Sequence, residues 1–157
     1  MAMIKDLLQD DLVIEDIKAR DKAGVIREFA ALLQAAGKVL DAGELVRALL
    51  DREALGSTGI GDGVAIPHGK LRNSRGIVVA FGRSHGGVDF QSLDDQPAYL
   101  FFLLATPESN AGEHLKILAR ISRILKNPAL RDKLRSATDR HELRQLILDE
   151  DGKYPQR

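Results

Sequence analysis

The stretch Gly59-Ile60-Gly61-Asp62-Gly63-Val64-Ala65-Ile66-Pro67-His68-Gly69-Lys70 decides how the middle of this chain is arranged. Val64-Ala65-Ile66 is a short apolar run and predicts a buried strand. Proline fixes its own φ and stiffens the approach to His68, whereas Gly69 allows the chain to turn away without a Cβ in the way. We therefore expect the His68 imidazole at the end of a strand, where functional sites are commonly built. Because the pKa of histidine lies near neutral pH, one ring nitrogen is free to act as a nucleophile.

The segments on either side of this stretch predict helices around a set of strands. Asp21 and Asp41 are candidate N-caps of helices that end near Ala36 and Gly56, and Asn110 is a candidate N-cap of a later helix. Strands are expected at 76–82, 88–90 and 99–105, and helices at 110–127, 129–135 and 139–149. The run at 99–105 is apolar throughout, as suits a central strand covered on both faces. The pattern predicts an α/β fold in which a sheet is sandwiched by helices.

Composition limits the kinds of function that the chain can have. Its 157 residues fit a single domain spanning 1–157, and Lys plus Arg equals Asp plus Glu at 23 each. A net charge of zero argues against a nucleic-acid-binding protein. The absence of cysteine excludes disulfides, thiolate metal sites and a cysteine nucleophile. The longest apolar run, Tyr99 to Ala105, is too short to span a bilayer, and no targeting segment is recognisable, so a cytoplasmic protein is expected.

The glycines around His68 leave backbone N–H groups accessible to an anion. The spacing matches neither the P-loop nor the dinucleotide-binding fingerprint. His114 falls in the first turn of its predicted helix, where the helix dipole disfavours the imidazolium, although the same position also suits an ordinary solvated histidine. Zinc held by His68, His85 and His114 is conceivable, but no pair of them has helical metal-ligand spacing, and we expect no metal or other cofactor.

Several other polar residues allow two interpretations. Arg52, in the last turn of its helix, either complements the helix dipole or presents a guanidinium to a phosphate. Ser57 and Thr58 are hydroxyl donors in a turn, or only caps. His85 lies in Arg83-Ser84-His85-Gly86-Gly87, which predicts a polar hairpin, and His141 is expected at the surface in the first turn of a helix.

The segment from Arg52 to Gly69 resembles the enzyme IIA domain of the bacterial phosphoenolpyruvate-dependent phosphotransferase system, in the fructose–mannitol class that includes the nitrogen-regulatory IIA proteins. The stretches from Gly87 to Leu104 and from His114 to Arg123 also match, so the resemblance covers nearly the whole chain. It implies a single α/β domain with a mixed central sheet flanked by helices on both sides. It also implies a phosphotransferase enzyme.

The resemblance further implies roles for individual residues. His68 would be the phosphorylated histidine, His114 the second active-site histidine and Arg52 the active-site arginine. Backbone N–H groups near Ser57, Thr58 and Gly59 would help to hold the phosphoryl oxygens. Mannitol-type members carry glutamate where this chain has Asp62 and nitrogen-type members often carry asparagine, so no role is assigned to Asp62.

Two functions follow from the resemblance. In both, a histidine phosphocarrier protein, HPr or its nitrogen-branch paralogue, phosphorylates His68, with no nucleic acid or membrane insertion involved. In the first, the phosphoryl group passes to a IIB component for sugar uptake, and because this chain has no cysteine, that IIB would be a separate chain. In the second, which the nitrogen-type motifs and the free-standing domain favour, phosphorylation controls binding to a regulatory target protein.

Overall fold

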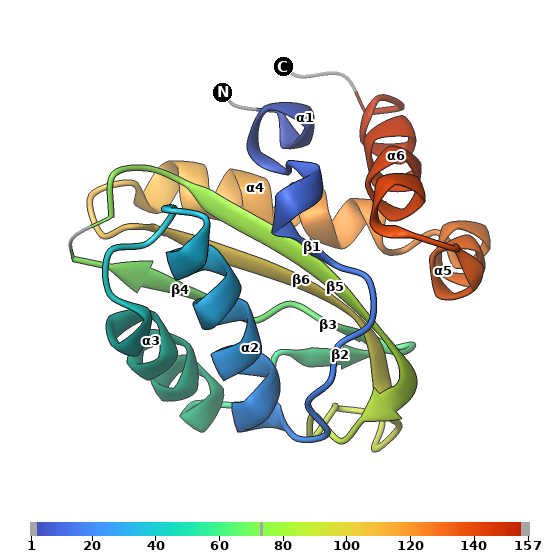
Figure 1. Ribbon diagram of the computed structural model, residues 1–157, viewed down its shortest axis with the longest axis horizontal. Coiled ribbons are helices and arrows are strands. Elements are labelled where there is room, and N and C mark those ends of the chain that lie inside the picture. Colours follow the sequence, from blue (N-terminus) through green and yellow to red (C-terminus); the bar gives the residue numbers. More distant parts are fainter. Residues whose placement is uncertain (1–2, 73, 155–157) are drawn as a thin grey trace.

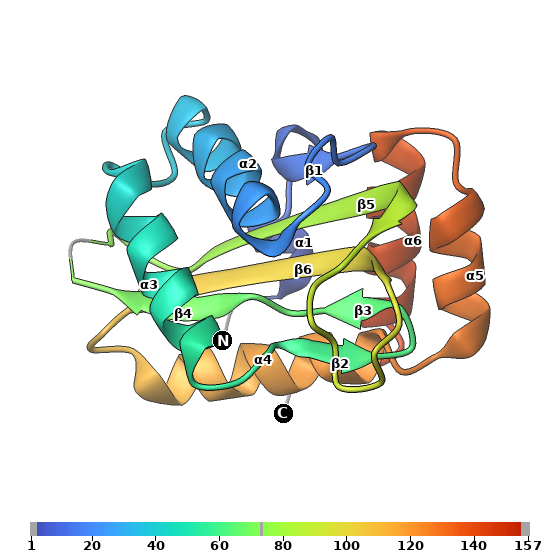
Figure 2. The same ribbon diagram turned by 90° about the horizontal axis from the view of Figure 1, so that it is seen from below.

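The computed structural model describes residues 3–72 and 74–154, in which a mixed six-stranded sheet lies between layers of helices (Figures 1 and 2). The strands are β1 (Val13–Ile14), β2 (Gly59–Gly61), β3 (Val64–Ala65), β4 (His68–Leu71), β5 (Val78–Val88) and β6 (Ala98–Pro107). The helices are α1 (Ile4–Leu7), α2 (Lys22–Ala35), α3 (Ala42–Ala54), α4 (Ala111–Ile124), α5 (Pro128–Ser136) and α6 (Arg140–Asp151), with a 3-10 turn at Asp10–Leu12. The predicted α/β fold class is confirmed.

Helices α2 and α3 cover one face of the sheet and α4 covers the other (Figure 2). The Asp21 and Asp41 side chains accept hydrogen bonds from backbone N–H groups in the first turns of α2 and α3, as predicted. Asn110 is the N-cap residue of α4, as predicted, but its side chain makes no cap hydrogen bond. Its ψ of 43° departs from the extended backbone that turns a capping side chain over the first helical turn.

Strand β6 is the centre of the sheet, whose order is β1-β5-β6-β3-β2, with β4 also paired to β6. It is antiparallel to β5 and parallel to β3 and β4. Strands β3 and β4 lie one after the other along the same edge of β6, with Val64 opposite Leu100 and His68 opposite Leu104. They are two halves of one interrupted strand.

The interruption at Ile66–Pro67 has a chemical cause. Pro67 has no N–H to donate, so it cannot continue the ladder as a donor. The Ile66 N–H donates to the Thr58 carbonyl, 3.0 Å away, on the side of β2. The Pro67 carbonyl accepts from the Leu104 N–H at 3.0 Å, and regular pairing resumes at His68.

This arrangement corrects the expectation for His68 and Gly69. His68 begins a strand rather than ending one, and Gly69 continues along β4 instead of turning the chain away. A Cβ on Gly69 would lie 3.4–3.5 Å from Leu49 and Ala48 of α3. The glycine thus lets α3 pack closely on the strand that carries His68.

Strand β5 also differs from its prediction. Separate strands at 76–82 and 88–90 with a polar hairpin between them are wrong, because β5 runs without a break from Val78 to Val88. The extra residues are absorbed by a register shift against β6 between Arg83 and Val88, where Gly87 has a φ of +82°. The polar residues of this segment did not end the strand because two of them, Arg83 and Ser84, are buried.

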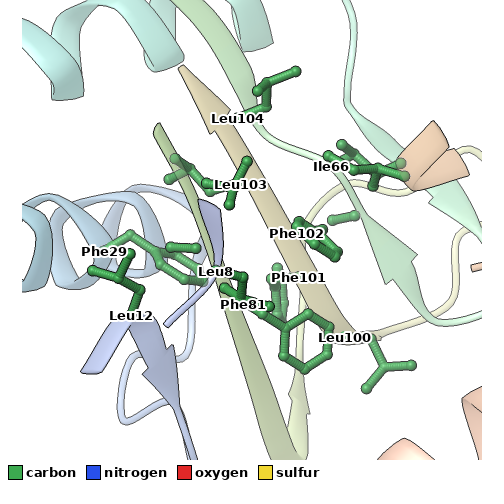
Figure 3. Packing of buried hydrophobic residues seen from close by; sticks show 14 of the residues in the cluster. Leu8, Leu12, Phe29, Ile66, Phe81, Leu100, Phe101, Phe102, Leu103 and Leu104 are labelled. Atoms are coloured by element: carbon green, nitrogen blue, oxygen red, sulfur yellow. The ribbon is translucent and has the colours of Figure 1, made fainter. Parts of the chain in front are cut away.

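The core is built on β6, as the apolar run at 99–105 predicted. Phe101, Phe102 and Leu103 have no solvent exposure. The rings of Phe81 and Phe102 meet edge to face with centroids 5.6 Å apart. Figure 3 shows Phe29 of α2 and Leu12 of the 3-10 turn lying beside β5, and Ile117 and Ile121 of α4 belong to the same buried cluster. Within the described residues, no helix is both long enough and apolar enough to cross a membrane.

Candidate functional site

His68 stands at the start of β4 with its imidazole partly buried. Its Nδ1 lies 2.6 Å from the Ile66 carbonyl oxygen. A carbonyl only accepts hydrogen bonds, so Nδ1 carries the proton and Nε2 keeps its lone pair. The pKa of His68 lies below its ordinary value, mainly because the ring is buried. The hydrogen bond to Ile66 raises this pKa, the charge of Arg52 lowers it and the charge of Glu53 raises it, but burial has the largest effect. The ring is therefore a neutral nucleophile at neutral pH.

Helix α4 brings a second imidazole to the first. The rings of His68 and His114 are 5.7 Å apart between centroids and inclined at 54°. His114 is 5% exposed, which excludes the solvated alternative, and its Nδ1 lies 2.8 Å from Thr106 Oγ1. Burial, followed by the nearby His68 and Lys70, lowers the pKa of His114 to about 4. His114 is thus a neutral hydrogen-bonding group beside the nucleophile.

The low pKa of His114 predicts a loss of stability in mild acid. The unfolded chain takes up this proton near pH 6.5 and the folded protein only near pH 4, so the unfolded state is favoured as pH falls between these values. We expect His114 to contribute a loss of about 2 kcal/mol in unfolding free energy between pH 7 and pH 5. Urea unfolding of wild type and His114→Gln at both pH values measures this. An equal pH dependence in the two proteins would contradict it.

Arg52 reaches the same place from the last turn of α3. Its Nη1 donates to the Gly56 carbonyl at 2.9 Å. Arg52, His68 and His114 line one open groove of about 410 Å³. Ala48, Asp51, Leu55, Gly69, Lys70, Leu115 and Leu118 line the rest of it. Two of these, Leu55 and Leu115, are 85% and 66% exposed and give the groove an apolar rim.

Phosphate binding was expected of Ser57, Thr58 and Gly59. In the structure, their N–H and hydroxyl groups donate hydrogen bonds to other groups of the protein. The Ser57 hydroxyl donates to the Phe90 carbonyl at 2.8 Å, and the Gly59 N–H donates to Ser57 Oγ at 3.0 Å. Both the N–H and the hydroxyl of Thr58 donate to the Glu53 carboxylate. These bonds give all three residues a place in the architecture beneath the groove, and phosphate binding by them stays a prediction.

Gly59→Ala is expected to destabilise the protein by about 1–3 kcal/mol, because a Cβ there would lie 2.9 Å from the Ser92 Cα, which belongs to the backbone. Thermal unfolding measures the effect. Gly112→Ala is the matched control, since no atom lies within 4 Å of the Cβ it would add. A Gly59→Ala protein that melts like wild type yet accepts phosphate slowly would instead favour the phosphate-binding role.

The remaining histidines lie outside the groove. His85 is exposed on β5, and His141 lies at the surface of α6 with Nδ1 3.2 Å from Asp10 Oδ2. The described residues include no group of three or more His, Asp or Glu side chains arranged to hold a metal ion. Asp62 occupies the turn between β2 and β3 with a φ of +59°, and its N–H donates to the Asp94 carboxylate. That geometry gives Asp62 a role in the turn.

Thr106 was missed in the sequence, although a signal was present. It directly follows the apolar run at 99–105, so it marks the carboxyl end of the central strand. Polar residues at strand ends are where sites are commonly built. The Ile66 carbonyl could not be identified in the same way, because its role depends on a local bend of the backbone.

Residues 6–150 match the family described as phosphoenolpyruvate-dependent sugar phosphotransferase system, EIIA 2. A nitrogen regulatory protein of Bradyrhizobium diazoefficiens is 40% identical over 138 residues, which are 87% of this chain and 88% of that protein. A fructose-specific EIIABC component of Bacillus subtilis is 38% identical over 94% of this chain, which spans only 23% of that longer protein. The crystal structure of nitrogen regulatory protein IIA-Ntr from Neisseria meningitidis superposes with a TM-score of 0.86 at 31% identity, covering 92% of this chain and 98% of that one.

Proposed function

Because the chain belongs to the EIIA 2 family of the phosphoenolpyruvate-dependent sugar phosphotransferase system, whose members are phosphoryl-transferring enzymes, we propose that His68 accepts the phosphoryl group. One observation carries the proposal. The Ile66 carbonyl holds the proton on Nδ1, which leaves the Nε2 lone pair of a neutral ring at the groove. The donor is a phosphohistidine on a small phosphocarrier protein, HPr or its nitrogen-branch paralogue.

The reaction is an in-line displacement at phosphorus. The Nε2 lone pair of His68 forms a bond to phosphorus while the P–N bond on the donor histidine breaks, and its electron pair returns to the donor ring. No proton moves in this step. The Nδ1–H of His68 stays hydrogen-bonded to the Ile66 carbonyl oxygen, and this bond stabilises the positive charge that the phosphorylated ring acquires.

Arg52 and His114 stabilise the transferring group. The oxygens of the phosphoryl group carry spread negative charge in the transition state, and a guanidinium is suited to hold two of them. Arg52 supplies this group from the wall of the groove. The neutral ring of His114, 5.7 Å from that of His68, donates an N–H or keeps the His68 ring in place.

Arg52→Ala is expected to slow phosphoryl transfer about a hundredfold, because one charge-assisted contact to a developing anion contributes about 3 kcal/mol. The time course of phosphate uptake from the phosphorylated carrier measures it. Arg47→Ala, an exposed arginine on the same helix, is the matched control and should transfer at the wild-type rate. Equal rates in the two variants would show that Arg52 serves only the end of α3.

The output of this phosphorylation is proposed to be regulatory, of the nitrogen type. Two similarities support this: the 40% identity to a nitrogen regulatory protein and the TM-score of 0.86 to a IIA-Ntr structure. The physical basis is a change of charge. Phosphorylation adds up to two negative charges to a chain whose formal net charge is zero, beside the apolar rim of Leu55 and Leu115. A target that docks there is repelled, or attracted if it presents arginines.

A pull-down from native lysate tests this output. His68→Ala and phosphorylated wild type are used side by side as baits, and at least one partner outside sugar transport is expected to prefer one of them. Recovery of the same partners by both baits would contradict regulation through His68.

The second candidate is transfer to a separate IIB component for sugar uptake. It is favoured by the 38% identity to a fructose-specific EIIABC component. If only a IIB component is recovered in the pull-down, and deletion of the gene abolishes growth on one sugar, the transport function is the correct one.

A further inference from the structure

A single carboxylate beneath the groove joins three separate parts of the chain. Glu53 follows Arg52 on α3, and its side chain is 3% exposed. It accepts from Lys22 Nζ at 2.9 Å, from the Thr58 N–H at 3.0 Å and from the Thr58 hydroxyl. Lys22 is the first residue of α2, and Thr58 directly precedes β2. Glu53 therefore fixes the segment after α3 against both helices.

Stability alone is a weak explanation for this pair. The free energy lost when two charges are removed from water offsets much of their attraction, and well-packed apolar residues often stabilise a protein equally well. The contacts of Thr58 indicate a role in positioning the site. Thr58 donates to the Glu53 carboxylate and its carbonyl accepts from the Ile66 N–H, so it connects Glu53 to the segment that precedes His68.

A continuous series of hydrogen bonds leads from Glu53 to His68. The carboxylate accepts the Thr58 N–H; the Thr58 carbonyl accepts the Ile66 N–H at 3.0 Å; and the Ile66 carbonyl accepts Nδ1–H of His68 at 2.6 Å. The N–H and the carbonyl of Thr58, like those of Ile66, belong to adjacent peptide groups, so the series acts through position: each bond fixes the residue whose carbonyl makes the next bond. The last bond is the one that leaves Nε2 unprotonated.

The same carboxylate also supports the guanidinium. Arg52 Nη1 is held by the Gly56 carbonyl, and Gly56 lies between Glu53 and Thr58 in the chain. The Gly56 N–H donates to the backbone carbonyl of Glu53 at 3.0 Å. Residues 56–58 are thus anchored at both ends by Glu53, once through its carbonyl and once through its carboxylate.

We propose that Glu53, paired with Lys22, is a positioning residue for phosphoryl transfer, which through Thr58 fixes both the carbonyl that orients Arg52 and the carbonyl that selects the Nδ1–H tautomer of His68. The proposal rests on the proposed function of His68. Glu53 does not touch the phosphoryl group. Its charge also raises the pKa of His68, against the effect of Arg52, which agrees with its proximity to the site.

The test uses Glu53→Gln and the double variant Glu53→Gln with Lys22→Met, which removes the pair without leaving a buried charge unpaired. Imidazole ¹⁵N NMR reports the tautomer of His68, and single-turnover transfer from the phosphorylated carrier gives the maximal rate and the carrier concentration at half-maximal rate. We expect loss of the pure Nδ1–H tautomer and a maximal rate lower by about tenfold or more, at an unchanged half-saturating concentration. If the single variant does not fold, the double variant carries both measurements.

Glu150→Gln is the matched control. Glu150 is also buried and paired with a lysine, Lys153, but it lies on α6, outside the groove. It should change neither the tautomer nor the rate. A maximal rate within twofold of wild type in the double variant overturns the proposal, and so does a slower rate with an unchanged tautomer. If wild type takes no phosphate on His68, the proposed function fails separately, and the tautomer alone then decides whether Glu53 positions the ring.

Discussion

His68→Ala is expected to abolish phosphorylation of this protein. With phosphoenolpyruvate, enzyme I and the phosphocarrier present, wild type should acquire acid-labile phosphate and the variant none. The reason is that a backbone carbonyl fixes the proton of His68 on Nδ1, which leaves Nε2 unprotonated on a partly exposed ring at the groove. His114 does not replace it, because that ring is buried, with its Nδ1 at hydrogen-bonding distance from Thr106.

His85→Ala and His141→Ala are the matched controls, since both rings are exposed and outside the groove. Both should be labelled as fully as wild type. Mapping of the phosphate after alkaline digestion locates it directly. Full labelling of His68→Ala would overturn the assignment of the acceptor.

Arg83→Met is expected to lower the unfolding free energy by about 3–5 kcal/mol, because three backbone carbonyls lose a charged donor at about 1–3 kcal/mol each. Arg83 is 1% exposed on β5. Its guanidinium donates to the carbonyls of Glu15, Leu134 and Ala137 at 3.1, 2.9 and 2.6 Å. The substitution leaves these carbonyls without a donor, and it removes the positive charge at the C-terminal end of α5.

Urea unfolding measures this loss, and limited proteolysis shows where the fold loosens. Cleavage should increase first between α5 and α6, because the network holds that connection to the sheet. Arg27→Met, at an exposed arginine on α2, is the control and should be neutral. A loss below about 1 kcal/mol would show that the helix end finds other donors.

Local chemistry predicted those parts of the fold that depend on neighbours in sequence. The caps at Asp21 and Asp41 and the apolar run at 99–105 required only helix-end chemistry and periodicity. Strands β1 and β2, with two and three residues, are too short to give a periodic pattern. The prediction of a hairpin at Arg83–Gly87 was wrong, because an arginine in a polar segment is ordinarily exposed to solvent. Arg83 is instead buried by carbonyl partners that lie about fifty residues later in the chain, which the local sequence does not reveal.

The site divides in the same way. Taken alone, Arg52 and His114 each allowed an ordinary interpretation, and the resemblance to enzyme IIA assigned them to one site with His68; the structure brings all three to one groove. The strand that His68 begins was not predictable, because the break before it depends on a carbonyl of Thr58 and a peptide of β6. Glu53 gave no signal, since an acidic residue in a polar helix is ordinarily solvated.

The interrupted strand has a consequence for how such a protein can carry information. Both halves are bonded to β6, so the His68 ring stands at a junction held by backbone pairing on either side. Under the proposed function, we expect phosphorylation of His68 to leave this paired backbone in place. Under the proposed regulatory output, a partner would distinguish the two forms by the charge at the groove rather than by a change of shape, and the signal would last only as long as one P–N bond survives in water.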